Sequence, residues 1–305
     1  MLSVIDFEGI AKRVIIYLTG GDRSKVRGRP VRLVFSCISA ILILFLCNLA
    51  LGANSSAPKY SAVVVDANTR AILFSENEGK RLHPAGLTKL MTLYVAFQAL
   101  EDGEIGLDDK VIISNHAAAE APVKLGLRGG QKVRLRYLIR AAGVEGSNDA
   151  ATAIAEHIEG SEAAFARRMN RTAEALGMTR STFRNAHGLT EAGQLSTARD
   201  IAVLLLALNE EFPDYFNLFG RISTSAGVKT VRHSGRRLLS GDYRILGAKT
   251  GYTRASGFSG VTLSQIGYKK IITVVFGGRS TTTRNAQMHK LRDLGFKKAS
   301  AVMTR

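Results

Sequence analysis

The stretch Pro84-Ala-Gly-Leu-Thr-Lys-Leu-Met-Thr92 opens a helical pattern. Apolar residues follow at helical spacing as far as Leu100, which predicts a helix with Gly86 at its start. Because residues three apart share one face of a helix, Lys89 is expected to lie one turn after Gly86, on the same face. The start of this helix therefore brings Gly86 and Lys89 together.

The segments around this helix alternate in a recognisable order. A β-branched run over 60–66, a turn at 66–69 and a return strand over 71–75 predict a hairpin before it. Helical patterns follow over 134–142, 149–158, 161–176 and 197–208, with Thr197 as N-cap and Asp200 in the first turn of the last one. Strands are expected over 245–250, 257–264 and 269–276, and a closing helix over 282–294. This order predicts an α+β domain with an inserted helical lobe.

Three short motifs fall at the ends of these elements. Gly86-Leu-Thr-Lys89 lies at a helix start, Gly146-Ser-Asn148 at the turn before a helix, and Lys249-Thr-Gly251 on a strand. Further blocks are Met169-Asn170, His187-Gly-Leu189 and Ser196-Thr-Ala198. A single Lys-Thr-Gly triplet is weak, whereas this ordered series is specific.

The series resembles the S-x-x-K, S-x-N and K-T-G motifs of the D-alanyl-D-alanine carboxypeptidases, which are low-molecular-weight penicillin-binding serine peptidases. The resemblance spans roughly residues 58–296 and implies a β-lactamase-like fold, an antiparallel sheet flanked by helices with the site beside the helical lobe. It assigns Lys89 to the proton acceptor and Asn148 to the relay and substrate amide. It also assigns Lys249, Thr250 and Gly251 to the strand that binds the peptide, with the Lys249 cation meeting the terminal carboxylate of the peptide. No metal and no cofactor is implied.

The sequence departs from this pattern at the reacting groups. The nucleophile position holds Gly86 and the relay-serine position holds Gly146, while Val123 stands where the family often has Ser. Glycine has no side chain, so no acyl-enzyme can form at position 86. The resemblance therefore predicts a catalytically impaired homologue that acts on or binds the stem peptides of peptidoglycan.

Two other functions are consistent with these residues. One is an active D,D-carboxypeptidase that recruits another hydroxyl, with Ser147 or Thr88 as candidates. The other is a non-enzymatic envelope scaffold or interaction protein with an empty cleft.

The N-terminal region predicts export. Residues 33–53 are almost entirely apolar and follow a basic run, which favours a signal peptide or an uncleaved signal anchor with residues 1–32 on the cytoplasmic side. Both cysteines, Cys37 and Cys47, lie inside this segment, so the exported part has neither a disulfide nor a thiol. The expected location is periplasmic or extracytoplasmic, with residues 33–53 as the only inner-membrane anchor.

The net charge of +17 first suggests nucleic-acid binding, but its distribution argues against that partner. Residues 1–57 contribute +4, and the remaining chain keeps 35 Lys and Arg against 22 Asp and Glu. A basic exported domain, with a basic tail over 297–305, is expected to meet anionic envelope polymers, the membrane surface or other cell-wall enzymes. Nucleic acid is not expected.

Overall fold

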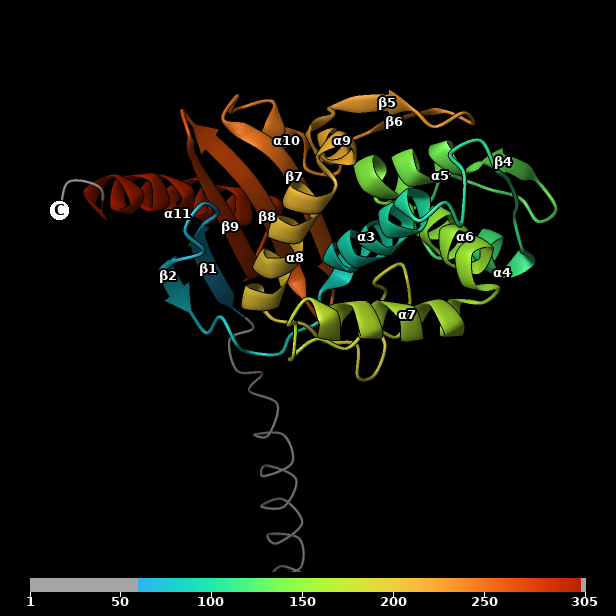
Figure 1. Ribbon diagram of the computed structural model, residues 1–305, viewed down its shortest axis with the longest axis horizontal. Coiled ribbons are helices and arrows are strands. Elements are labelled where there is room, and N and C mark those ends of the chain that lie inside the picture. The colour runs from blue at the N-terminus through green and yellow to red at the C-terminus, as the bar shows by residue number, and fades with distance from the viewer. Residues whose placement is uncertain (1–59, 303–305) are drawn as a thin grey trace, which may run out of the picture. The chain divides into compact units, whose positions relative to one another are not determined.

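A five-stranded antiparallel sheet forms the centre of the fold (Figure 1), and its strand order is β2-β1-β9-β8-β7. The structure is a computed structural model and describes residues 60–302. The strands are β1 (Ser61–Asp66), β2 (Ile72–Glu76), β7 (Ile245–Thr253), β8 (Gly257–Ile266) and β9 (Lys269–Gly278). The predicted hairpin and the three predicted later strands are all confirmed, and β7 lies at one edge of the sheet.

Helices cover both faces of this sheet. Along β1, Val63 and Val65 belong to one hydrophobic core, whereas Ala62 and Val64 belong to the other. Because side chains alternate between the faces of a strand, a strand covered on both faces reads as a continuous apolar run. Helix α8 (Ala198–Glu211) contributes to the first core and α11 (Thr281–Val302) to the second (Figure 1).

The N-terminus of α8 is capped as the sequence predicted. The Thr197 hydroxyl accepts a hydrogen bond of 3.0 Å from the backbone N–H of Asp200. Such a cap satisfies one of the donors that the first turn of a helix leaves unpaired.

The predicted helical lobe lies between β2 and β7 in the sequence. Its central helix, α3 (Thr88–Glu101), is buried along almost its whole length, which explains why its sequence is so apolar. The other elements are η2 (Ala85–Leu87), α4 (Asn115–Ala119), α5 (Leu135–Arg140), η3 (Ala141–Glu145), α6 (Asn148–Glu159), α7 (Glu162–Ala175), α9 (Pro213–Phe216), η4 (Asn217–Gly220) and α10 (Arg236–Leu239). Two small two-stranded antiparallel sheets complete it, β3 (Lys110–Ile112) with β4 (Lys132–Arg134) and β5 (Ser223–Ser225) with β6 (Thr230–Arg232).

The structure differs from the sequence prediction mainly in short elements. The helix expected over 134–142 changes at Ala141 into the π-helical turn η3, which ends at Gly146 in a left-handed conformation. Hairpins of three-residue strands and helices of four or five residues are too short to show a period, so the sequence did not predict them. The closing helix begins at Thr281 and continues to Val302, beyond the predicted end.

The predicted targeting segment 33–53 lies outside the described residues. Within residues 60–302, none of the helices combines the length and the apolarity that a membrane crossing requires.

Candidate functional site

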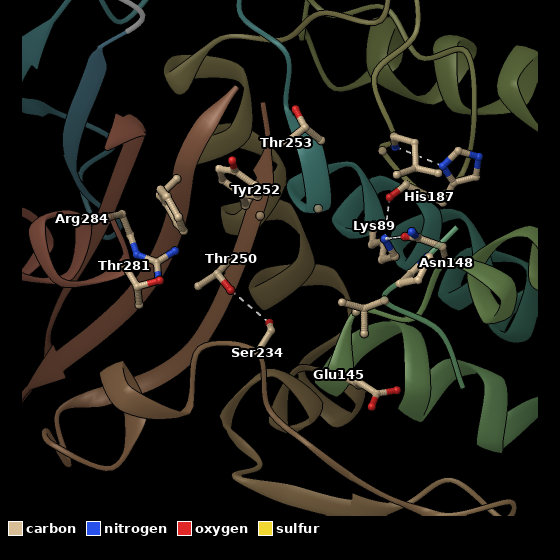
Figure 2. A pocket seen from close by; sticks show the side chains of 18 residues that line it. Lys89, Glu145, Asn148, His187, Ser234, Thr250, Tyr252, Thr253, Thr281 and Arg284 are labelled. Carbon is tan, nitrogen blue, oxygen red and sulfur yellow. Dashed lines mark hydrogen bonds between the residues drawn. The ribbon is translucent and has the colours of Figure 1, made fainter. Parts of the chain in front are cut away.

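A cavity of 340 Å³ lies where the edge strand β7 faces the starts of α3 and α6 (Figure 2). The residues of all three sequence motifs line it, because η2, the turn before α6 and β7 converge there. They are Gly86, Lys89, Gly146, Asn148, Thr250 and Gly251. Of the predicted site residues only Lys249 is absent from this lining, since its side chain is fully buried.

Lys89 lies at the bottom of the cavity with 2% of its surface exposed. Its ammonium donates hydrogen bonds to Asn148 Oδ1 at 2.6 Å and to the backbone oxygen of His187 at 2.5 Å (Figure 2). Burial lowers the pKa of Lys89 to about 7, although two carboxylates, those of Glu120 and Asp149, oppose the shift. An amine that titrates near neutral pH is the usual property of a general base.

Asn148 is the first residue of α6, and both ends of its amide group are engaged. Its oxygen accepts from Lys89, and its Nδ2 donates to the backbone oxygen of Ala121 at 2.8 Å. Gly146, two residues earlier, has a φ of +89°, which is the left-handed region that favours glycine. A Cβ at position 146 would lie in ordinary contact with Lys249 Nζ at 3.7 Å. Backbone conformation rather than lack of space therefore opposes a side chain at this position.

The fully buried Lys249 side chain reaches the π-helical turn η3. Its ammonium donates to the backbone oxygens of Ala142 and Gly143 at 2.6 and 2.7 Å. Burial and the nearby Lys89 cation lower the pKa of Lys249 well below its usual range. The side chain therefore joins β7 to the helical lobe and positions Thr250 on the cavity side.

The backbones of Gly86 and Gly251 lie against each other. A Cβ at position 86 would be 2.7 Å from the backbone oxygen of Thr250 and 3.1 Å from Gly251 Cα. Reciprocally, a Cβ at position 251 would be 2.4 Å from the Gly86 nitrogen. The space that the first atom of a nucleophilic side chain would need is thus occupied by strand β7.

The two hydroxyls considered as substitute nucleophiles lie elsewhere. Thr88 and Ser147 are both fully buried, and neither lines the cavity. The Thr88 hydroxyl has no hydrogen-bond partner, whereas the Ser147 hydroxyl donates to Glu145 Oε2 at 2.6 Å. Neither hydroxyl is placed to reach a substrate in the cavity.

The structure adds two polar residues that the sequence reasoning missed. Ser234 contributes a hydroxyl that accepts a hydrogen bond of 3.1 Å from Thr250 Oγ1. Arg284, from α11, lines the cavity although it is 3% exposed, and it donates to the backbone oxygen of Ser259 at 2.7 Å. Both come from segments without a motif, so only the fold reveals them.

Arg284 places a guanidinium beside the cavity, whose lining also includes Lys89 and Glu145. Burial lowers its pKa to about 10, so the guanidinium stays cationic at neutral pH. Among the described residues, no carboxylate lies within ion-pair distance of this cation, as its absence from the ion pairs of residues 60–302 shows. A buried cation without a counter-ion beside a cavity favours an anionic ligand.

Comparison with characterised proteins gives the same family for sequence and structure. The D-alanyl-D-alanine carboxypeptidase family matches residues 53–280. The chain is 33% identical to the D-alanyl-D-alanine carboxypeptidase DacF of Bacillus subtilis over 241 residues, which cover 77% of this chain and 61% of that protein. It is 34% identical to DacA of Escherichia coli over 244 residues, covering 78% and 60%. The chain thus spans about three fifths of the length of these relatives.

Solved structures of penicillin-binding proteins share the fold. Penicillin binding protein 5 from Haemophilus influenzae is 30% identical, with a TM-score of 0.75 over 78% of this chain and 70% of that one. Penicillin-Binding Protein D2 from Listeria monocytogenes, in its ampicillin-bound form, is 25% identical with a TM-score of 0.72 over 80% and 99%. The expected fold, an antiparallel sheet flanked by helices with a helical lobe, is confirmed. The chain therefore belongs to the D-alanyl-D-alanine carboxypeptidase family.

Proposed function

We propose that this chain is a non-acylating member of its family that binds the D-Ala-D-Ala ends of peptidoglycan stem peptides. The single observation that carries the proposal is the glycine at position 86, in contact with strand β7. No hydroxyl is present there, and the backbone of β7 occupies the place of its Cβ. Since a serine-type acyl transfer needs a hydroxyl within reach of its base, Lys89 has no partner to activate.

The binding half of the site supports the second part of the proposal. A peptide lying along the edge strand β7 would add backbone hydrogen bonds to a sheet edge, and its terminal carboxylate would meet the Arg284 guanidinium and the Thr250 hydroxyl. Lys249 supports this arrangement indirectly, because its ammonium is already bound to two backbone oxygens.

Two measurements on the purified protein test the proposal together. Incubation with a fluorescent penicillin is expected to leave no covalent adduct in a denaturing gel or in an intact mass spectrum. Titration calorimetry with an N-acylated L-Lys-D-Ala-D-Ala peptide is expected to show binding, and the same peptide with a C-terminal amide is expected to bind at least about tenfold more weakly. A stoichiometric penicillin adduct would overturn the first part.

A matched pair of variants locates the bound peptide. Arg284→Gln is expected to remove the preference for the free carboxylate, whereas Arg199→Gln, on an exposed arginine that does not line the cavity, leaves it unchanged. Failure of wild-type protein to bind either peptide would favour the alternative scaffold role, in which the basic surface contacts anionic envelope polymers or other cell-wall enzymes. Release of D-alanine abolished by Ser147→Ala would favour the active-enzyme alternative.

The proposed location is outside the cytoplasmic membrane. It rests on residues 33–53, on the basic run before them and on the chemistry of the substrate class, which is a cell-wall polymer. A fusion of alkaline phosphatase after the last described residue should be active in intact cells, and deletion of 33–53 should abolish that activity.

A further inference from the structure

A second cluster of titratable groups lies outside the cavity lining, where α4 meets the start of α7. His116 is the second residue of α4, Glu120 follows the last residue of that helix, and Glu162 is the first residue of α7. One nitrogen or oxygen atom from each lies within 4.8 Å of the others. His116 Nε2 is 3.3 Å from Glu162 Oε2 and 3.9 Å from Glu120 Oε1.

The two carboxylates are held in place by hydrogen bonds. Glu120 Oε1 accepts from the Thr152 hydroxyl at 3.0 Å, and Glu162 Oε1 accepts from the backbone N–H of Ala186 at 2.9 Å. Their side chains are only 8% and 15% exposed. Glu162 thus turns its other oxygen, Oε2, toward His116, whereas Glu120 presents to His116 the same Oε1 that accepts from Thr152. The His116 side chain is 62% exposed and so opens the cluster to solvent.

His187 completes the surroundings of the two carboxylates. Its Nδ1 accepts a hydrogen bond from the backbone N–H of Leu189 at 3.0 Å, so the ring proton of the neutral form lies on Nε2. That Nε2 is 3.3 Å from Glu120 Oε1 and 3.4 Å from Glu162 Oε1. His187 Nε2 therefore lies beside both carboxylates as an outer neighbour, and such neighbours commonly orient the ligands of a metal.

The charges of the cluster are unbalanced. Two largely buried carboxylates face each other, and within residues 60–302 only the rings of His116 and His187 lie within ion-pair distance of them. Buried charges are normally paired or coordinate a metal, and a cation bound between these side chains would balance the two carboxylates.

We propose that His116, Glu120 and Glu162 bind a zinc ion. The donor set favours zinc, because an imidazole with two carboxylates suits Zn²⁺ and related transition metals, while Ca²⁺ and Mg²⁺ take oxygen ligands almost exclusively. Three protein ligands leave a fourth position for water on the exposed side of His116. Local spacing does not indicate this site, because Glu162 lies far along the chain from His116 and Glu120.

Zinc here would fix α4 to α7 and hold the His187 loop, whose backbone oxygen accepts from Lys89. The proposed zinc site is thus connected to Lys89 in the cavity through His187. Zinc binding itself does not require a bound peptide. The proposal stands or falls separately from the proposed function.

The test is calorimetric titration of ZnCl₂ into the full chain in detergent, after tag removal and chelator treatment. One zinc per chain is expected, and His116→Ala and Glu120→Gln are each expected to weaken its binding by at least about 100-fold. His157→Ala is the control, because His157 faces only one carboxylate, that of Asp109, at 3.2 Å. It should leave zinc affinity unchanged.

Substitution of Co²⁺ gives a second readout that does not depend on affinity. The wild type should develop the visible absorption of a four-coordinate Co²⁺ site, and His116→Ala should lose it. Since His116 is exposed, His116→Ala is expected to keep the circular dichroism of the wild type. This variant therefore tests zinc binding even where Glu120→Gln does not fold. Absence of stoichiometric zinc binding, or equal binding by wild type and His116→Ala, would overturn the proposal.

Discussion

Restoring the missing serine should not restore acylation. Gly86→Ser returns the hydroxyl that the family motif has at this position, yet its Cβ would lie 2.7 Å from the Thr250 backbone oxygen. Carbon and oxygen atoms in contact are normally more than half an ångström further apart, so η2 and β7 would have to separate. Because β7 is held to the lobe by Lys249 and to the sheet by β8, this separation strains two well-packed elements.

The expected size of that strain follows from comparable substitutions. Forcing an extra group into a packed site costs about 1–3 kcal/mol. For a domain of this length that corresponds to a fall in Tm of about 2–12 °C. Gly86→Ala carries the same Cβ without the hydroxyl and should lose as much stability. Gly79→Ser is the matched control, since a Cβ there meets nothing within 4 Å and its Tm should stay unchanged.

The assay pairs thermal unfolding with fluorescent-penicillin labelling of the same preparations. Gly86→Ser is expected to unfold at lower temperature than wild type and to stay at background labelling. Adding Gly146→Ser should lower the Tm further, because a non-glycine residue in the left-handed region costs about 1–2 kcal/mol. Stoichiometric labelling of Gly86→Ser at an unchanged Tm would refute the reasoning, since it would mean that the cleft accepts the side chain without moving.

Three further outcomes are expected. Lys89 has a pKa of about 7 in the folded chain and an ordinary, higher one when unfolded, so the unfolded state binds the extra proton between pH 7 and pH 9. The free energy of unfolding in urea should therefore rise with pH over that window, by at most about 1.4 kcal/mol per pH unit from this group, and Lys89→Met should flatten the rise. Thr197→Ala should lose about 1 kcal/mol of stability in urea through its lost cap, while Thr197→Ser loses little. Asp149→Ala should cost at least about 2 kcal/mol, since that carboxylate accepts from three backbone N–H groups of 125–127; equal stability of the variant and wild type would contradict this.

Long periodic segments and ordered motifs were predictable from the sequence. The central strands and the helices around α3 and α8 carry apolar residues at their own periods, and the three motifs occur in the order of a known family. Sequence reasoning also placed Lys89, Asn148 and Thr250 at one site, because the resemblance supplied their spatial relation. The proximity of these three residues is a property of the tertiary fold, and it cannot be predicted from their spacing along the chain.

Arg284, Ser234 and the zinc ligands could not be predicted in the same way. Arg284 belongs to the closing helix, where an arginine is an ordinary surface residue until α11 packs across the sheet and buries it beside the cavity. Likewise, Asp149 reads in the sequence as a first-turn charge of α6. Only the fold shows that it fixes the loop before it through hydrogen bonds. Such roles depend on which distant backbone approaches the residue, and no local pattern records that.

Gly86 also changes how the loss of the nucleophile is understood. A serine lost from an otherwise open site would leave a gap the size of its side chain, whereas here the glycine backbones at 86 and 251 close that gap by direct contact.

Lys89 nevertheless keeps its buried position, its bond to Asn148 and a pKa near 7. Keeping a lysine buried costs free energy, and under the proposed non-acylating function that cost needs another use to offset it. The geometry offers a structural use. The Lys89 ammonium binds Asn148 at the start of α6 and the backbone oxygen of His187, so it fixes these two segments of the cavity wall to each other. On this reasoning, Lys89→Met should weaken peptide binding, and undiminished peptide binding by that variant would show that the buried lysine has no role in the cleft.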